Sequence, residues 1–198
     1  MIAVVDYGMG NRRSVEKAIV HVGGSAIITR DHEAIRAADG VVVPGVGAFP
    51  RAMEHLRELG LDDLLRERAA AGVPLLGICL GMQLLFEESE EHGGAAGLGL
   101  VPGTVRYLDT QGRRLPHIGW NLVSALRPGT LLRGDAAYYH VHSLACHPAD
   151  PDDVAGVTTY GETFCTVIER GNVAGCQFHP EKSSRDGLAL LRGFVEAA

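Results

Sequence analysis

The sequence predicts an α/β fold: three layers, with a mostly parallel central sheet flanked by helices, and antiparallel strands in the C-terminal half. In the first half, short unbroken Val/Ile/Leu runs alternate with segments of helical periodicity, which is typical of parallel strands buried on both faces. In the second half the runs alternate more and turn signals separate them, which favours antiparallel pairing. A length of 198 residues with 46% hydrophobic residues suits one domain over residues 1–198 with a sizeable core.

The first half predicts strands and helices in alternation. A helix from Asn11 would place Val15, Ala18, Ile19 and Val22 on one face. The expected strands span residues 2–6, 25–29, 40–45 and 73–79, and further helices span 51–59, 61–71 and 81–91.

The second half predicts mixed or antiparallel strands. A Gly-rich segment at 90–100 precedes them and is expected to be a surface loop. A last helix over 184–197 would present Leu188, Leu191 and Val195 on its apolar face. The expected strands span 103–108, 138–143, 153–160 and 166–178, the last interrupted by a turn at "RGN".

Composition excludes several classes of function. No apolar run approaches about 18 residues, so no membrane span is expected, and the N-terminus lacks the basic region of a signal peptide. A net charge of −6 without a basic block argues against nucleic acid as the main partner. The four cysteines form no CxxC pair, so we expect a reduced, cytoplasmic location, no metal site and no cofactor.

The stretch "GICLGMQ" places Cys79 where a buried strand turns into a helix. Gly77 and Gly81 flank it in the pattern G-x-C-x-G, the thiol version of the nucleophile elbow. Such an elbow lifts the side chain above the sheet and aims a helix N-terminus at it, which lowers a thiol pKa. The motif therefore favours a nucleophile, with a buried structural cysteine as the alternative.

A nucleophilic cysteine needs a base and donors for the developing oxyanion. In "CQFHPEKSS" a strand-like run ends at His179, and Glu181 follows where a carboxylate could orient the imidazole. Backbone amides of Val46 and Gly47, in the turn "PGVG", and of Leu80 are the candidate oxyanion donors. A plain strand-to-helix turn is the alternative for "PGVG".

With these segments in hand, the chain resembles the class I (triad) glutamine amidotransferases over essentially its whole length. "GICLGMQ" and "QFHPEKS" are typical of the superfamily. "DYGMGN", "PGVGAF", "PHIGWN" and "HPEKSS" are similar to its branch that serves histidine biosynthesis. The resemblance implies the flavodoxin-like fold of that family.

The resemblance also implies a Cys79–His179–Glu181 triad that hydrolyses glutamine through a thioester. It implies that glutamine is bound by Gly45, Gly47, Gln83 and the backbone of His142, Ser143 and Leu144. The sequence departs from the family at Leu144, where an aromatic residue is frequent, and at His140, where Phe is frequent. These departures leave the triad intact and concern the glutamine pocket.

The resemblance further implies a partner, a separate cyclase subunit built as a (β/α)8 barrel. Ammonia would pass to it for synthesis of imidazole glycerol phosphate and AICAR by the heterodimer. Trp120, the only tryptophan, would lie at the interface, although a core position is the alternative. The other interface candidates are Asn11, Arg12, Pro116 and Lys182.

Two other classes of function remain open from the residues alone. His140 and His142 share a strand face and, with His117 or His179, could ligate zinc in a metal-dependent hydrolase. A cysteine peptidase or a chaperone-like protein could also use this fold, although neither needs Glu181 in register after His179.

Overall fold

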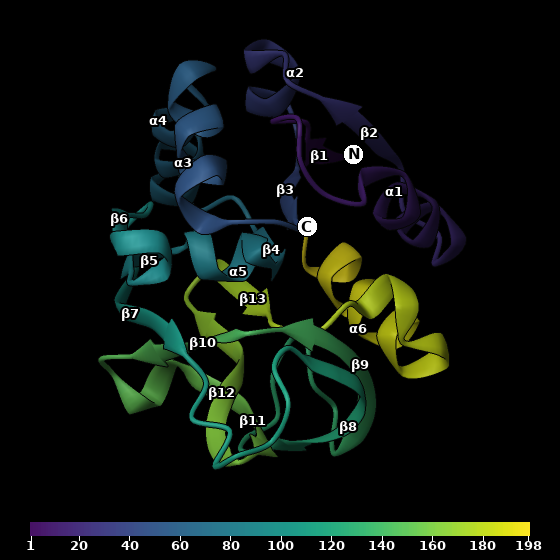
Figure 1. Cartoon of the computed structure of the whole chain (residues 1–198). Coiled ribbons are helices and arrows are strands. Elements are labelled where there is room, and N and C mark those ends of the chain that lie inside the picture. The colour runs from purple at the N-terminus through teal and green to yellow at the C-terminus, as the bar shows by residue number, and fades with distance from the viewer.

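A computed structural model describes residues 1–198 and confirms the predicted α/β class, with a central sheet between helices (Figure 1). Five strands form its parallel part in the order β2-β1-β3-β4-β13. Their carboxyl ends therefore lie at one edge, where functional groups of such sheets gather. These strands are β1 (Ile2–Val5), β2 (Ala26–Thr29), β3 (Gly40–Gly45), β4 (Leu75–Cys79) and β13 (Val173–Cys176).

Helices cover both faces of the parallel strands. α1 (Arg12–His21) and α6 (Ser184–Ala197) pack on one face, seen on the right in Figure 1. In β1, Ile2 and Val4 belong to the core on that side, and Ala3 and Val5 to the core on the other. This alternation explains why the strands are apolar throughout. The opposite face carries α2 (His32–Arg36), α3 (Phe49–Glu58), α4 (Leu61–Ala70) and α5 (Leu80–Leu84).

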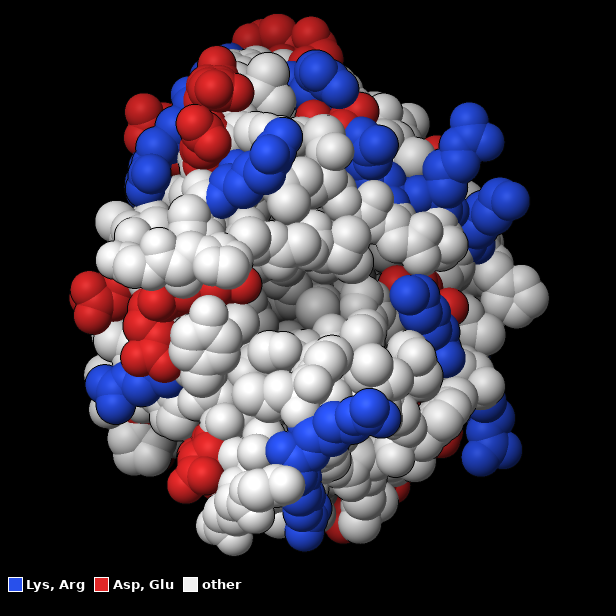
Figure 2. All heavy atoms as spheres, viewed as in Figure 1, with Lys and Arg blue, Asp and Glu red and all other residues white.

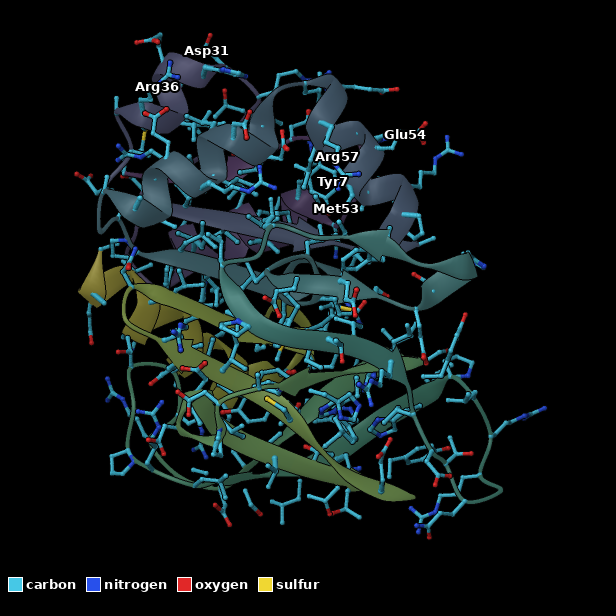
Figure 3. All side chains as sticks on the ribbon, turned by 90° about the vertical axis from the view of Figure 1, so that its left-hand side faces the viewer. Tyr7, Asp31, Arg36, Met53, Glu54 and Arg57 are labelled. Atoms are coloured by element: carbon cyan, nitrogen blue, oxygen red, sulfur yellow. The ribbon has the colours of Figure 1, made fainter.

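The helix α2 was not expected from the sequence, because it is only five residues long. Asp31 caps it by accepting a hydrogen bond from the amide of Ala34 at 2.8 Å. Arg36, at the other end of the helix (both residues are labelled in Figure 3), pairs with Glu67 of α4 at 3.0 Å. A cap and an ion pair thus hold a helix that is too short to show a periodic pattern.

The C-terminal half extends the sheet with mainly antiparallel strands, as predicted. β12 (Glu162–Arg170) pairs antiparallel with β13, β10 (Leu144–Pro148) and β11 (Val154–Tyr160). Beyond β11 lie β8 (His117–Ala125) and β9 (Ala136–His142). Beyond β10 lie β7 (Val101–Tyr107), β5 (Phe86–Ser89) and β6 (Ala95–Ala96). Short 3₁₀ turns are η1 (Glu91–Gly93), η2 (Pro151–Asp153) and η3 (Pro180–Lys182).

The predicted helix over 81–91 is wrong beyond Leu84. The chain instead forms β5, because Phe86 is fully buried and pairs with Val101 of β7. The predicted surface loop over 90–100 is wrong in part, since Ala95–Ala96 is a strand and Leu98 is buried. Two strands, β8 and β10, were not expected, because β8 is exposed along one face and β10 contains a proline.

The last helix has the predicted bounds, and its buried face differs slightly. Leu191 is buried as expected, together with Leu190 and Phe194, whereas Leu188 and Val195 are only partly buried. None of the helices combines the length and apolar character needed to cross a membrane.

Candidate active site

Cys79 lies at the carboxyl end of β4 with a backbone conformation that L residues rarely adopt, φ 55° and ψ −113°. A non-glycine residue at positive φ is costly and persists only where surrounding structure enforces it. Here β4 is buried throughout and α5 begins at the next residue, so the chain reverses at the thiol. This is the sharp strand-to-helix turn predicted from G-x-C-x-G.

Three glycines make this turn sterically possible. A Cβ on Gly77 would lie 2.6 Å from the carbonyl oxygen of Gly81, and one on Gly81 would overlap the carbonyl of Val43. Gly45, opposite Cys79 on β3, would meet the Tyr7 hydroxyl at 2.7 Å. The glycines therefore let α5 pack directly on the ends of β3 and β4.

His179 and Glu181 lie beside the elbow, after the end of the neighbouring strand β13. The imidazole Nδ1 lies 2.9 Å from Glu181 Oε1, and the exposed fractions of the two side chains are 2% and 1%. A carboxylate can only accept a hydrogen bond, so Nδ1 of His179 must carry a proton and donate it to Glu181. The buried Nε2 of His179 has no hydrogen-bond partner and is free to exchange a proton.

The electrostatics of this pair favour a charged imidazole. Burial alone lowers the pKa of His179, but the side chains of Cys79 and Glu181 outweigh it and raise the pKa to about 9. The imidazolium is therefore the favoured form once the thiol proton of Cys79 has passed to His179 and left a thiolate.

Two buried glutamines lie on the other side of Cys79. Gln83, on α5, donates from Nε2 to Gln177 Oε1 at 3.0 Å and to the carbonyl of Leu144 at 3.5 Å. Gln177 in turn places its Nε2 3.7 Å from Cys79 Sγ. Sequence reasoning did not single out Gln177, although it stands two residues before His179 in "QFHPE".

A pocket of about 300 Å³ opens at Cys79, within the size range of small-molecule sites. The face in Figure 2 is hollowed near its centre, with uncharged residues over most of the hollow and charged ones mainly toward the edge. Glu91, which sequence reasoning missed, is the one charged side chain in the lining, and Pro116 lies at the same pocket. The lining also contains Val46, Gly47, Leu80, Gln83, Val141, His142, Ser143 and Leu144.

The three candidate oxyanion donors all line this pocket. The amides of Val46 and Gly47 donate no hydrogen bond within the protein. Leu80 opens α5, so its amide belongs to the first turn, which has no partner inside the helix. Gly47 has φ +112°, a conformation that favours glycine, and a Cβ there would lie 2.6 Å from Met9 Cε. Gly45 differs from these residues, because it is packed beneath α5 and does not line the pocket.

The candidate interface residues lie in different elements. Trp120 on β8 is 54% exposed, so the alternative of a core tryptophan is wrong. Arg12 begins α1 and pairs with Asp6, and Asn11 precedes it. Lys182 is exposed in η3, three residues beyond His179.

His117, His140 and His142 are buried together between β8 and β9, but they do not form a metal site. His117 Nδ1 lies 3.2 Å from His142 Nε2, and His142 Nδ1 lies 2.7 Å from the carbonyl of Leu144. His140 contacts Thr166 and the carbonyl of Tyr138 instead. Burial lowers the pKa of His140 and of His142 to about 3, so both are neutral. No group of three or more His, Cys, Asp or Glu side chains is arranged to hold a metal ion.

A strained cysteine elbow, a buried His–Glu pair and a pocket on a doubly covered sheet together define a class of protein. Residues 3–198 match the family described as glutamine amidotransferase class-I, and the chain belongs to this family. Two solved structures share its fold. A glutamine amidotransferase aligns with a TM-score of 0.79 at 21% identity, over 99% of this chain and 98% of that one. PurLQS from Thermotoga maritima aligns with a TM-score of 0.79 at 17% identity, over 99% and 97%.

Within the family, more similar proteins identify the branch. The chain is 52% identical to the imidazole glycerol phosphate synthase subunit HisH of Moorella thermoacetica, over 98% of this chain and 94% of that protein. It is 51% identical to the HisH subunit of Bacillus cereus strain G9842, over 98% and 93%. The HisH subunit of Chlorobium luteolum is 44% identical over 99% of this chain and its own full length. The chain belongs to the HisH branch.

Proposed function

We propose that this protein hydrolyses glutamine to glutamate and ammonia at Cys79 and delivers the ammonia to a cyclase subunit. The cyclase would use it to make imidazole glycerol phosphate and AICAR in histidine biosynthesis. The HisH relatives, which are named as subunits of imidazole glycerol phosphate synthase, support this proposal. The observation that carries the proposal is the Cys79 elbow, which faces the pocket beside the 2.9 Å His179–Glu181 pair.

The triad would act in two stages. The Cys79 proton passes to His179 Nε2, and the thiolate attacks the side-chain carbonyl carbon of glutamine. When the tetrahedral intermediate collapses, His179 donates that proton to the leaving nitrogen, and ammonia departs. Water, deprotonated by the same Nε2, then attacks the thioester, and glutamate leaves as the Cys79 sulfur is released. Glu181 stabilises the imidazolium throughout by accepting at Nδ1.

The backbone amides of Leu80 and of the Val46–Gly47 segment would stabilise the oxyanion of each tetrahedral intermediate. The amides of Val46 and Gly47 donate no hydrogen bond within the protein, and their segment can reorient because glycine tolerates unusual peptide conformations. A missing oxyanion donor costs on the order of 100- to 1000-fold in rate. The orientation of this one turn would therefore set whether the site is active.

The pocket has the polar groups that free glutamine requires. Glu91 is its only charged side chain; Oε2 accepts from the Phe49 amide at 2.6 Å, and Oε1 has no hydrogen bond, with His92 Nε2 3.9 Å away. We assign Glu91 to the α-ammonium group of glutamine, because a buried cation needs an acceptor of opposite charge. Gln83 and the backbone of residues 142–144 would hold the rest of the substrate. The buried Gly45 would serve by letting α5 approach β3 rather than by touching glutamine.

Association with a cyclase subunit is supported by an apolar surface on β8. Ile118, Trp120 and Leu122 alternate along the strand and are 59%, 54% and 54% exposed. This apolar ridge, Ile118–Trp120–Leu122, is the kind of surface that an aromatic anchor makes at an interface. We propose a heterodimer with a (β/α)8-barrel cyclase. Asn11, Arg12, Pro116 and Lys182 are the further proposed contacts, with Lys182 pairing to an acidic group.

The test is a glutaminase assay on wild type and Cys79→Ala, with and without the cyclase subunit and its nucleotide ligand. We expect the isolated chain to be nearly inactive, the complex to be active, and Cys79→Ala to lose activity on the order of 10⁶-fold. Activity that survives in Cys79→Ala would refute the mechanism. Full activity of the isolated chain would refute control by the partner.

A further inference from the structure

Gln177 is a fully buried polar residue beside the nucleophile, and the two-stage mechanism above does not use it. Its exposed fraction is 0%, and it lies in the segment between β13 and His179. Its amide nitrogen is 3.7 Å from Cys79 Sγ, and its amide oxygen accepts from Gln83 at 3.0 Å. A buried amide is retained only where both of its ends are satisfied, and one of these ends is the reacting sulfur.

The direction of the two amides follows from one backbone carbonyl. Leu144 O is an acceptor only, so the Gln83 atom that faces it must be the NH₂ group. The same NH₂ group faces Gln177, which must therefore present its oxygen there. The opposite end of the Gln177 amide, the end that faces Cys79, must then be an N–H donor.

The Gln177 N–H donor faces a sulfur atom that has few charged side chains near it. Four titratable side chains influence or are influenced by Cys79: Tyr7, Cys146, Cys176 and His179. Burial raises the pKa of Tyr7, of Cys146 and of Cys176 well above the usual range, so these three stay uncharged. His179 is thus the charged partner of the thiolate, and Gln177 supplies a neutral donor from another direction.

We propose that Gln177 is a further catalytic residue, whose side-chain N–H stabilises the Cys79 thiolate once the thiol proton has moved to His179. Gln83 is then a positioning residue as well as a substrate-binding one, because it holds Gln177 in the donating orientation. The same donor would stabilise the sulfur again when glutamate leaves. This inference rests on Cys79 being the nucleophile.

The test measures the rate of Cys79 alkylation by iodoacetamide against pH, because this rate follows the thiolate fraction and requires no glutamine. The full chain is used, and Cys79→Ala supplies the background from the other three cysteines. Removing a hydrogen bond to a charged group destabilises that group. For a thiolate, the loss corresponds to a change of about 10- to 100-fold in the equilibrium between thiolate and thiol. Gln177→Met, which keeps the side-chain length, should therefore move the inflection up by about one to two pH units. Gln83→Met should move it less.

His140→Phe is the matched control, since it also replaces a buried polar side chain near the site without touching the glutamine pair. We expect its inflection to equal that of wild type. If Gln177→Met, folded by circular dichroism, keeps the wild-type inflection and only raises the KM for glutamine, Gln177 merely supports Gln83 and the inference is wrong. Equal shifts in Gln177→Met and His140→Phe would overturn it too. If Cys79→Ala retains glutaminase activity, the proposed function itself is wrong. The alkylation profile tests only the role of Gln177, so the two failures can be told apart.

Discussion

Two regions of the molecule use apolar strands in opposite ways. At the end of β4 every residue is buried, and neighbouring glycines force Cys79 into a strained conformation. On β8 the apolar side chains of the ridge Ile118–Trp120–Leu122 point away from the core and stay exposed. The first region is built to hold one geometry by itself, whereas the second leaves apolar area uncovered. The comparison teaches that the geometry around Cys79 is fixed by packing within the chain, whereas the exposed ridge on β8 leaves an apolar surface free for the partner proposed above.

The largest effect should come from breaking the prepared geometry at its carboxylate. Glu181→Gln keeps an acceptor near His179 but removes the charge, and we expect kcat/KM for glutamine in the complex to fall roughly 10⁴-fold. Glu181 is one of two groups that raise the pKa of His179 to about 9. Without the Glu181 charge the pKa of His179 falls, so His179 loses its imidazolium proton at a lower pH than in the wild type. The alkaline limb of the rate profile should therefore move below pH 9; a limb unchanged in Glu181→Gln would contradict this account.

A second change strains the elbow directly. Gly81→Ala would drive a methyl group into the carbonyl of Val43, so α5 must move away from β3. We expect a loss of about 3 kcal/mol in the free energy of unfolding, measured by urea denaturation, and slower alkylation of Cys79. Gly134→Ala is the control, because nothing lies within 4 Å of a Cβ there and it should unfold like wild type. Equal stability of both variants would show that the close packing at Gly81 is not needed.

The third change tests the exposed region, where we expect a smaller effect on a different property. Trp120→Ala should weaken binding of the cyclase subunit by about 30-fold, as expected for an interface anchor of about 2 kcal/mol. Because the indole is 54% exposed in the free chain, the thermal midpoint of the isolated protein should hardly change. Calorimetric titration and a melting curve measure the two quantities. Val20→Ala, on an equally exposed residue of α1, is the control and should leave both unchanged. A large loss of stability with unchanged affinity would place Trp120 in the fold rather than in the interface.

Sequence patterns predicted the first four parallel strands well, because their continuous apolar runs reflect burial on both faces. The fifth, β13, was expected only as part of a mixed or antiparallel strand, and it pairs parallel with β4. The patterns failed at Phe86–Ser89, where the same apolar and acidic residues suit a helix or a strand equally. The choice was made by β7, which offers a pairing edge more than ten residues away in sequence. They also did not predict β8, whose outward-facing apolar residues resemble neither a core strand nor a solvated one.

The sequence by itself determined the local chemistry. It contains an elbow that needs Gly77 and Gly81, a strand-like run that ends at His179 before Pro180, and a carboxylate at Glu181. Each can be recognised from a short stretch of residues, although the contact that makes glycine necessary at position 81 comes from Val43 on a neighbouring strand. Only the tertiary structure decided that Gln177 points a donor at Cys79, that Glu91 lines the pocket and that Trp120 is exposed. These facts depend on which strands lie side by side and which face is covered. Long-range packing sets both, and no local pattern encodes them.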